Sequence, residues 1–164
     1  MLKWIAVLCL LNPVTAWAEA HPVSVGFGLE RGALNFGGQY DWKGAGYDRG
    51  VYLHLQTDRE KNGAKIVYQV LSLGAQLKAH LVQNGFMNVY AAPGFGVHMF
   101  KDLPDGAGSK SDITAWGPTL RLGVLSPLPN GLKIGVERFE IWNWFDDKPP
   151  ASVPFYQATL MLEF

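Results

Sequence analysis

The last ten residues of this 164-residue chain, 155–164, alternate between apolar and polar side chains with a period of two. The apolar positions that share one face are Tyr156, Ala158, Leu160, Leu162 and Phe164. The opposite face carries mainly polar side chains, among them Gln157, Thr159 and Glu163. This alternation is typical of a β-strand with one apolar face. The apolar face needs an apolar environment, and that requirement constrains the fold.

The same alternation recurs along the chain and predicts eight strands. Their expected ranges are 23–30, 33–42, 47–56, 66–81, 86–100, 114–125, 131–142 and 155–164. In the sixth of these, Trp116 and Leu120 share an apolar face while Thr119 and Arg121 lie opposite. Nineteen glycines, 13% aromatic residues and only 17% charged residues favour strands and tight turns over helices. We therefore predict an all-β fold.

Residues 1–18 are predicted to be a cleavable signal peptide. Lys3 supplies the positive charge, an apolar run follows it, and Ala16-Trp17-Ala18 matches an A-x-A cleavage site. The single cysteine, Cys9, falls inside this segment. Residues 19–164 then form one domain without cysteine, which excludes disulfides, thiol catalysis and Cys-ligated metals.

Export to the cell envelope affects how the apolar faces are interpreted. A soluble β-protein, the alternative here, turns its apolar face inward, whereas a transmembrane barrel turns apolar residues toward lipid and polar or small residues inward. The short predicted turns are 43–46, 82–85 and 126–130, and the longer connections are 57–64, 101–112 and 143–154. Short turns at one end and longer loops at the other favour the barrel. The net charge is zero, which gives no indication of nucleic-acid binding.

With these strands, the export signal and the terminal Phe164, the chain resembles the small eight-stranded outer-membrane barrels of Gram-negative bacteria. These include the OmpA, OmpX and Ail type and the lipid A 3-O-deacylase type. The resemblance implies an eight-stranded antiparallel transmembrane β-barrel, integral to the outer membrane. It also implies that Tyr156, Leu160, Leu162 and Phe164 belong to the signal read by the barrel-assembly machinery. The expected surroundings are outer-membrane lipid and lipopolysaccharide, and we expect a monomer.

An eight-stranded barrel is only wide enough for its interior to be filled by side chains. The predicted inward residues include Glu30, Asn35, Gln39, Asp41, Asp48, Tyr52, Gln56, Gln76, Lys78, His80, Asn88, Gln157 and Glu163. A candidate polar cluster in the lumen comprises His54, His98, Arg121, Glu137 and Glu140. Paired charges would close the lumen, and a gated path for small solutes or ions is the alternative.

His54, His98 and Glu30 also raise the hypothesis of a metal or acid–base site. No two of them have a ligand spacing along one strand, so neither a metal nor a cofactor is expected. The sequence therefore favours a structural role for both histidines.

The seventh predicted strand leaves several side-chain directions open. Its apolar face begins at Leu132 but continues in phase into Arg138 and Glu140. Either a bulge near Glu137 resets the phase, or the charges lie at the outer headgroup level. We favour a third interpretation, in which these three charges form an interior salt-bridge cluster that continues toward Arg121.

The same strand bears on catalysis. The lipid A deacylase family carries a His-x-Ser-Asn motif there, whose serine is activated by the base beside it. In this chain Glu140 stands at the His position and Trp142 at the Ser position, and only Asn143 agrees. Without a nucleophile and base we predict a structural or surface-interaction role and no catalytic residues. The alternatives are a divergent lipid A-modifying enzyme and a narrow small-solute or ion channel.

Overall fold

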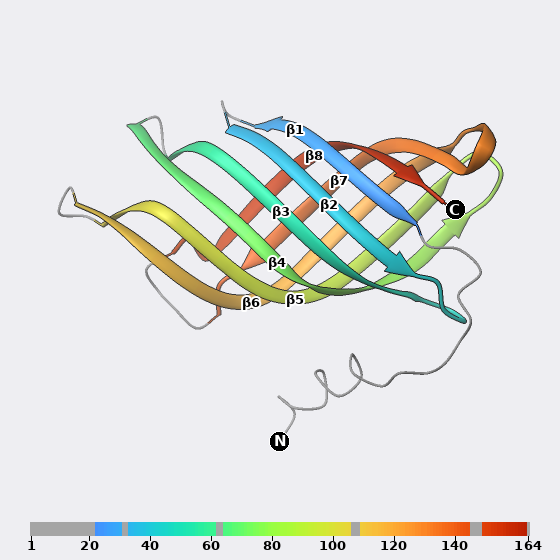
Figure 1. Ribbon diagram of the computed structural model, residues 1–164, viewed down its shortest axis with the longest axis horizontal. Helices are drawn as coiled ribbons and strands as arrows, with labels where there is room; N and C mark the ends of the chain where they lie inside the picture. The colour runs from blue at the N-terminus through green and yellow to red at the C-terminus, as the bar shows by residue number, and fades with distance from the viewer. Residues whose placement is uncertain (1–21, 31–32, 62–63, 106–108, 145–148, 164) are drawn as a thin grey trace, which may run out of the picture.

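The computed structural model describes residues 22–30, 33–61, 64–105, 109–144 and 149–163, and these residues form a closed antiparallel barrel of eight strands (Figure 1). The strands are β1 (Val23–Glu30), β2 (Ala33–Trp42), β3 (Asp48–Lys61), β4 (Ala64–Gln83), β5 (Asn88–Asp105), β6 (Ser109–Pro127), β7 (Leu132–Trp142) and β8 (Ser152–Leu162). A 3-10 helix, η2 (Pro129–Gly131), leads into β7. The predicted fold class is confirmed. The predicted signal peptide, 1–18, and Phe164 lie outside the described residues. Among those residues, no helix is both long and apolar enough to cross a membrane.

Each strand pairs with its neighbour in the sequence, and β1 pairs with β8 to close the sheet. At this seam Val23 lies opposite Leu162, and Phe27 lies opposite Ala158. The start of β1 and the end of β8 therefore lie at one end of the barrel (Figure 1). Closure matters because a lipid environment offers no hydrogen bonds to an open strand edge.

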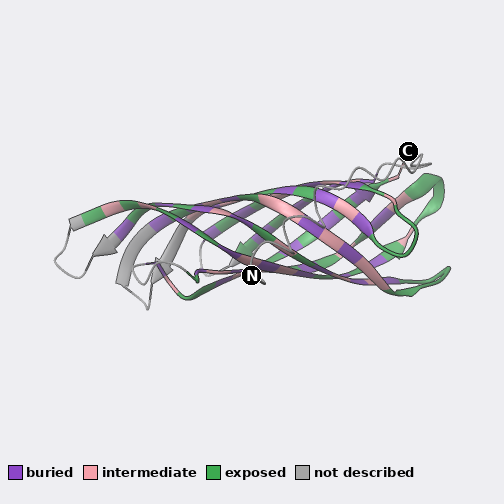
Figure 2. Ribbon diagram, turned by 90° about the horizontal axis from the view of Figure 1, so that it is seen from below, coloured by how far each residue is buried: buried purple, intermediate pink, exposed green. Residues whose placement is uncertain are grey.

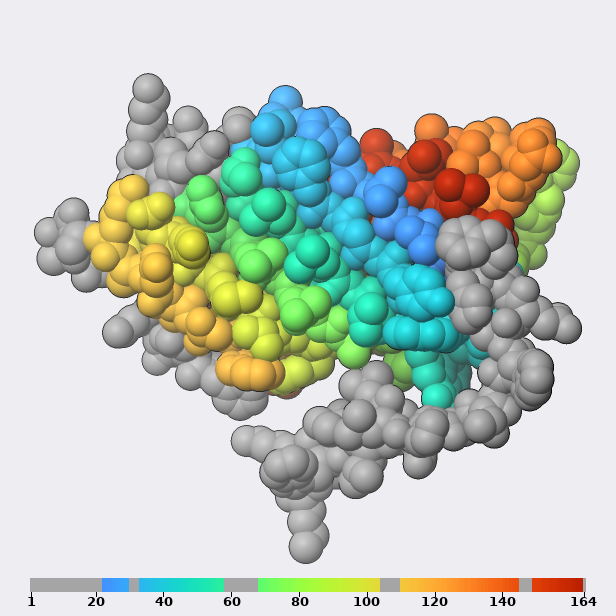
Figure 3. All heavy atoms as spheres, in the orientation of Figure 1, coloured from blue at the N-terminus to red at the C-terminus, as the bar shows by residue number. Residues whose placement is uncertain are grey.

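Buried and exposed residues alternate along the strands (Figure 2). On β8, Phe155, Gln157 and Thr159 are buried while Tyr156 and Leu160 are exposed. Large apolar side chains that lie exposed on the outside include Val25, Phe27, Leu53, Leu73, Trp116, Leu122 and Val136. Figure 3 shows the side chains of β1–β6 covering one face of the barrel. The apolar face thus points outward, which is the pattern of a barrel whose solvent is lipid.

The middle strands are much longer than the others. β4 has 20 residues and β6 has 19, whereas β1 has 8. The ends of β3–β6 farthest from η2 extend beyond the other strands (left in Figure 1). We call this extension, residues 57–61 and 64–69 of β3 and β4 and residues 101–105 and 109–112 of β5 and β6, the outer blade. Register shifts at its base fall between Gln56 and Arg59 and between Phe100 and Leu103.

The expected outer loops at 57–64 and 101–112 are therefore wrong. Lys61 pairs with Ala64 and Asp105 pairs with Ser109, so the backbone ladder continues almost to the hairpin tips. Beyond the barrel both faces of a strand can be polar. The alternation that reveals a strand is then lost although its hydrogen bonds persist.

The interior changes character along the barrel axis. The half nearer η2 holds most of the buried charges together with a small apolar cluster of Tyr90, Ala92, Leu125 and Met161, whereas a larger apolar core fills the half nearer the outer blade. This core comprises Tyr52, Tyr68, Val70, Phe100, Leu103, Ala115, Phe139, Ile141, Val153 and Phe155, with Ile113 packed against it. The predicted polar filling thus describes only part of the lumen. Inward faces at the blade end contact one another rather than water, so apolar side chains are stable there.

Two tyrosines that lie inside the barrel depend on inward glycines. A Cβ at Gly96 would stand 2.2 Å from the Tyr52 hydroxyl oxygen, and one at Gly123 would stand 2.4 Å from the Tyr90 ring. Both distances are far below van der Waals contact, so any other residue would displace the tyrosine. The absence of a side chain at these positions allows the rings to fill the lumen.

A charge introduced on the outward face should destabilise the barrel more in the middle of a strand than at its end. Ala158, in the middle of β8, faces outward, and an Ala158→Arg variant should lose about 2–4 kcal/mol of unfolding free energy in lipid vesicles. Leu162→Arg, on the same face at the strand end, should lose only about 0–1 kcal/mol, because the charge can reach the interface. Denaturant unfolding followed by tryptophan fluorescence measures both. Equal losses would contradict a lipid-facing β8.

Candidate functional site

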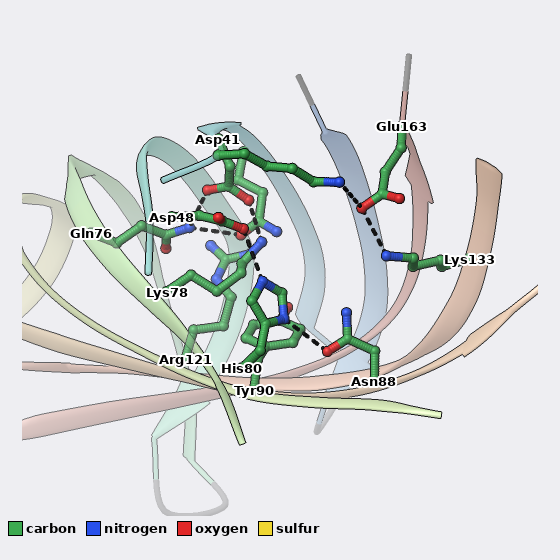
Figure 4. Close-up of polar contacts among 12 residues, drawn as sticks. Asp41, Asp48, Gln76, Lys78, His80, Asn88, Tyr90, Arg121, Lys133 and Glu163 are labelled. Atoms are coloured by element: carbon green, nitrogen blue, oxygen red, sulfur yellow. Dashed lines mark hydrogen bonds and ion pairs between the residues drawn. The ribbon is translucent and has the colours of Figure 1, made fainter. Parts of the chain in front are cut away.

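Two acidic groups organise the polar half of the interior (Figure 4). Asp41 forms a buried ion pair with Lys78, and the Gln76 amide donates to the same carboxylate at 3.1 Å. Gln76 also donates to the Gln39 oxygen at 2.9 Å. The Lys78 ammonium lies 4.7 Å from the centre of the Tyr90 ring. Lys78 thus has both an anion and an aromatic face near it, which compensate for the loss of water.

His80 connects the second acidic group to the strand beside it. Its Nε2 lies 2.9 Å from Asp48 Oδ2, and its Nδ1 lies 2.9 Å from Asn88 Oδ1. Both ring nitrogens face oxygen acceptors, an arrangement that suits a doubly protonated imidazolium beside a carboxylate. These contacts link the side chains of the adjacent strands β3, β4 and β5 (Figure 4).

The centre of the lumen holds an Arg121–Glu137 ion pair. Arg121 Nη1 lies 3.2 Å from Glu137 Oε2, and both side chains are at most 1% exposed. Glu137 also accepts hydrogen bonds from the Tyr90 hydroxyl and, at 2.7 Å, from Gln157 Nε2. The Arg121 guanidinium carbon lies 4.9 Å from the centre of the Phe139 ring. Glu137 is therefore well satisfied by hydrogen bonds, whereas Arg121 has a π-face beside it but its Nε and Nη2 have no hydrogen-bond partner among the described residues.

Above this pair the two predicted histidines have separate surroundings. His98 Nδ1 lies 2.8 Å from Ser72 Oγ, and Ser72 also donates to the Tyr52 hydroxyl at 3.5 Å. His54 packs between the rings of Phe139 and Phe155, with centroid distances of 4.9 and 4.4 Å. Neither ring nitrogen of His54 has a hydrogen-bond partner within the described chain. His54 thus behaves as part of the apolar core.

The structure agrees with only part of the predicted polar cluster in the lumen. His54, His98, Arg121 and Glu137 all lie buried inside the barrel, but only Arg121 and Glu137 contact each other. The interior cluster of Glu137, Arg138 and Glu140 is wrong for two of its members, because Arg138 and Glu140 lie outside. The pairing of β7 with both neighbours runs without a register shift, so alternation places Glu137 inward and Glu140 outward.

The arrangement of the interior does not favour catalysis or metal binding. The Ser72–His98 pair, which the sequence analysis missed, resembles an activated nucleophile beside its base. Both side chains are fully buried, however, so substrate cannot reach them. In the described part of the chain, no three His, Cys, Asp or Glu side chains converge to hold a metal ion. The side chain of Glu30, from the metal hypothesis, lies outside the described residues.

A last charged group joins strand ends at the rim near η2. Glu163 accepts a hydrogen bond from Lys133 at 2.7 Å (Figure 4) and forms an ion pair with Lys43 at 3.4 Å. Partial burial opposes ionisation of Glu163, but the two lysines outweigh it and hold its pKa below the ordinary value of 4.5. This group connects the end of β8 to β7 and to the β2–β3 turn.

Comparison with solved structures places the fold. The barrel matches Neisserial surface protein A with a TM-score of 0.63 at 11% identity, covering 88% of this chain and 94% of that one. Ail, the attachment invasion locus protein of Yersinia pestis, matches with a TM-score of 0.57 at 14% identity, covering 88% and 98%. The N-terminal β-barrel domain of Pseudomonas aeruginosa OprF matches with a TM-score of 0.56 at 11% identity, covering 88% and 96%.

The fold is that of the small outer-membrane barrels. No family model matches the chain, and no curated protein matches it significantly. The predicted resemblance to the OmpA and Ail type is confirmed as an architecture.

We predict that removing one partner of the Arg121–Glu137 pair lowers the unfolding free energy more than removing both. Arg121→Met alone should cost about 3–5 kcal/mol of unfolding free energy, because it leaves the Glu137 carboxylate buried without its cation. Adding Glu137→Met should recover much of that loss. Lys110→Met is the control, since its pair with Asp102 is more than half exposed and removing the pair should cost about 0–1 kcal/mol. A double variant less stable than Arg121→Met would contradict this account.

Proposed function

We propose that the protein is an integral outer-membrane barrel that acts through its outer surface and does not conduct through its lumen. Two features of the described residues support this proposal. The lumen is filled by packed side chains, and the outer blade extends a rigid sheet beyond the barrel. The first feature carries the proposal, because it argues against the channel.

The filling of the lumen rests on three rings above the Arg121–Glu137 pair. The centroids of Phe139 and Phe155 lie 5.7 Å apart, and His54 packs against both. All three side chains are at most 1% exposed. A solute moving along the axis would have to displace these rings and then the ion pair. An eight-stranded barrel leaves little room to do so.

The outer blade supports a role in surface contact. Near its base it carries both charge signs, with Lys110 Nζ 3.4 Å from Asp102 and the Asp102 amide donating to Asp112 at 3.2 Å. Asp102 adopts a left-handed backbone with φ of 58° at the bulge in β5. A paired sheet holds these groups in place, unlike a long loop. Two of the similar proteins are named as a surface protein and an attachment protein, which agrees with this kind of role.

Because the lumen is filled in this way, we predict that the wild-type protein does not conduct ions. The wild-type protein should show no steady openings in planar lipid bilayers, because the rings and the ion pair block the axis. A Phe139→Ala/Phe155→Ala/Arg121→Ala/Glu137→Ala variant should conduct, since it removes two phenyl rings of the apolar core together with the ion pair. Phe95→Ala provides the control, because that ring is 39% exposed on the outer face. Steady wild-type openings would refute the closed lumen.

The alternative enzyme activity has a direct test of its own. Lipid A from cells that express the protein should carry the same acyl chains as lipid A from cells with an empty vector. The outward residues of β7 supply no Ser or His to act as nucleophile and base. Mass spectrometry of extracted lipid A measures this, with the protein verified in the outer-membrane fraction. Loss or gain of an acyl chain would favour the divergent lipid A-modifying enzyme.

A further inference from the structure

Two charged residues interrupt the apolar outer face on β7. Arg138 and Glu140 face outward between Val136 and Trp142, and Arg138 Nη2 lies 2.5 Å from Glu140 Oε2. The Arg138 side chain is 45% exposed and that of Glu140 is 16% exposed. Neither residue belongs to the network that fills the lumen. Their charges therefore do not serve to stabilise the interior.

The neighbouring strands surround this pair with apolar groups. Leu122 and Tyr156 lie opposite Arg138 on the two sides, and Leu120 and Pro154 lie opposite Glu140. The Arg138 guanidinium carbon is 5.6 Å from the centre of the Tyr156 ring. The described contacts of the two charges are thus with each other and with this ring. Donor and acceptor capacity remains on the exposed side.

The depth of Arg138 and Glu140 along β7 makes their charges unfavourable for barrel stability. Trp142 lies four residues beyond Arg138 at the outer end of β7. With a rise of about 3.3 Å per residue and a tilt of about 40°, Arg138 lies about 10 Å below the level of Trp142 and Glu140 about 5 Å below it. Charged groups facing lipid at such depths destabilise a barrel, and ionisable residues inside a membrane mark functional sites by default.

An apolar groove adjoins the pair on the outer face. It has a volume of about 770 Å³ and contains Arg138, and its apolar walls include Phe27, Val136, Tyr156 and Ala158. Residues of β1 and of β4–β8 line the groove, including both sides of the seam, and Glu140 lies just outside it. Its shape and lining suit a hydrocarbon chain. The polar pair then lies where that chain is linked to its headgroup.

We infer that Arg138 and Glu140 form a binding site for an outer-leaflet lipid that carries a hydroxyl beside its acyl-linkage carbonyl, as hydroxyacylated lipid A does. This inference rests on the proposed outer-membrane location. The guanidinium donates to the ester or amide carbonyl, and the carboxylate accepts from the hydroxyl or amide N–H. The acyl chain lies in the groove. A phosphate alone fits less well, because Glu140 repels it.

Native mass spectrometry of the full-length barrel in detergent tests this site. Titration with purified hydroxyacylated lipid A should give an affinity at least about tenfold above that for phosphatidylethanolamine, which lacks the acyl hydroxyl. Glu140→Leu and Arg138→Leu/Glu140→Leu should abolish this preference while leaving the barrel folded, because leucine suits a lipid-facing position. Arg49→Leu, which changes a half-buried arginine near the opposite rim, should keep the preference.

Two results would overturn the site. One is an unchanged lipid A preference in the double variant, and the other is a wild-type protein without any preference. A dimer of the wild type that the double variant loses would assign the pair to a contact between two copies instead. Failure of the proposed function would be seen in two separate measurements. On a denaturing gel the protein band would not change its mobility on boiling, and the protein would be absent from the outer-membrane fraction.

Discussion

Pairing of β1 with β8 is the constraint on which the rest of the structure depends. In lipid an unpaired strand edge has no water to satisfy its backbone groups, so the sheet is stable only when it closes. Once eight strands close, the interior is narrow and must be filled, while the exterior must be apolar. The exposed Phe27 and Ala158 on the outer side of the seam, and the buried Gln157 and Thr159 inside it, follow from that geometry.

Filling a narrow lumen with polar groups requires that they satisfy one another. Glu137 does so by accepting hydrogen bonds from Tyr90 and Gln157 besides its ion pair with Arg121. The apolar core nearer the outer blade needs no partners, so the interior combines two solutions to the same packing problem. The inward glycines matter to the first solution, because Gly123 leaves the space that the Tyr90 ring occupies. The mutual satisfaction is incomplete, because Arg121 Nε and Nη2 and Gln157 Oε1 have no hydrogen-bond partner among the described residues.

The fold could be predicted because a period of two survives in every strand that contacts both lipid and lumen. The outer blade could not be predicted, since its strands leave the barrel and lose their apolar face, so the pattern at 57–64 and 101–112 predicts loops. In the lumen, the phases correctly placed His98 and Arg121 inside. They could not assign Glu140, because a break in an apolar face can mean either a bulge or a charge exposed to lipid. Only the pairing of β7 with its neighbours distinguishes the two.

The two Arg–Glu pairs of the barrel show why location decides the meaning of a charge. Glu137 is surrounded by the donors Arg121, Tyr90 and Gln157, and Arg121 lies beside the Phe139 ring, so both charges have partners within the barrel. Arg138 and Glu140 make a shorter contact, yet their neighbours on β6 and β8 are leucines, a proline and a tyrosine. Replacing this outer pair with leucines would remove a desolvation cost and disrupt no lumen contact. A pair that the fold does not require is best explained by a ligand, and the ligand that reaches this face of a membrane barrel is lipid.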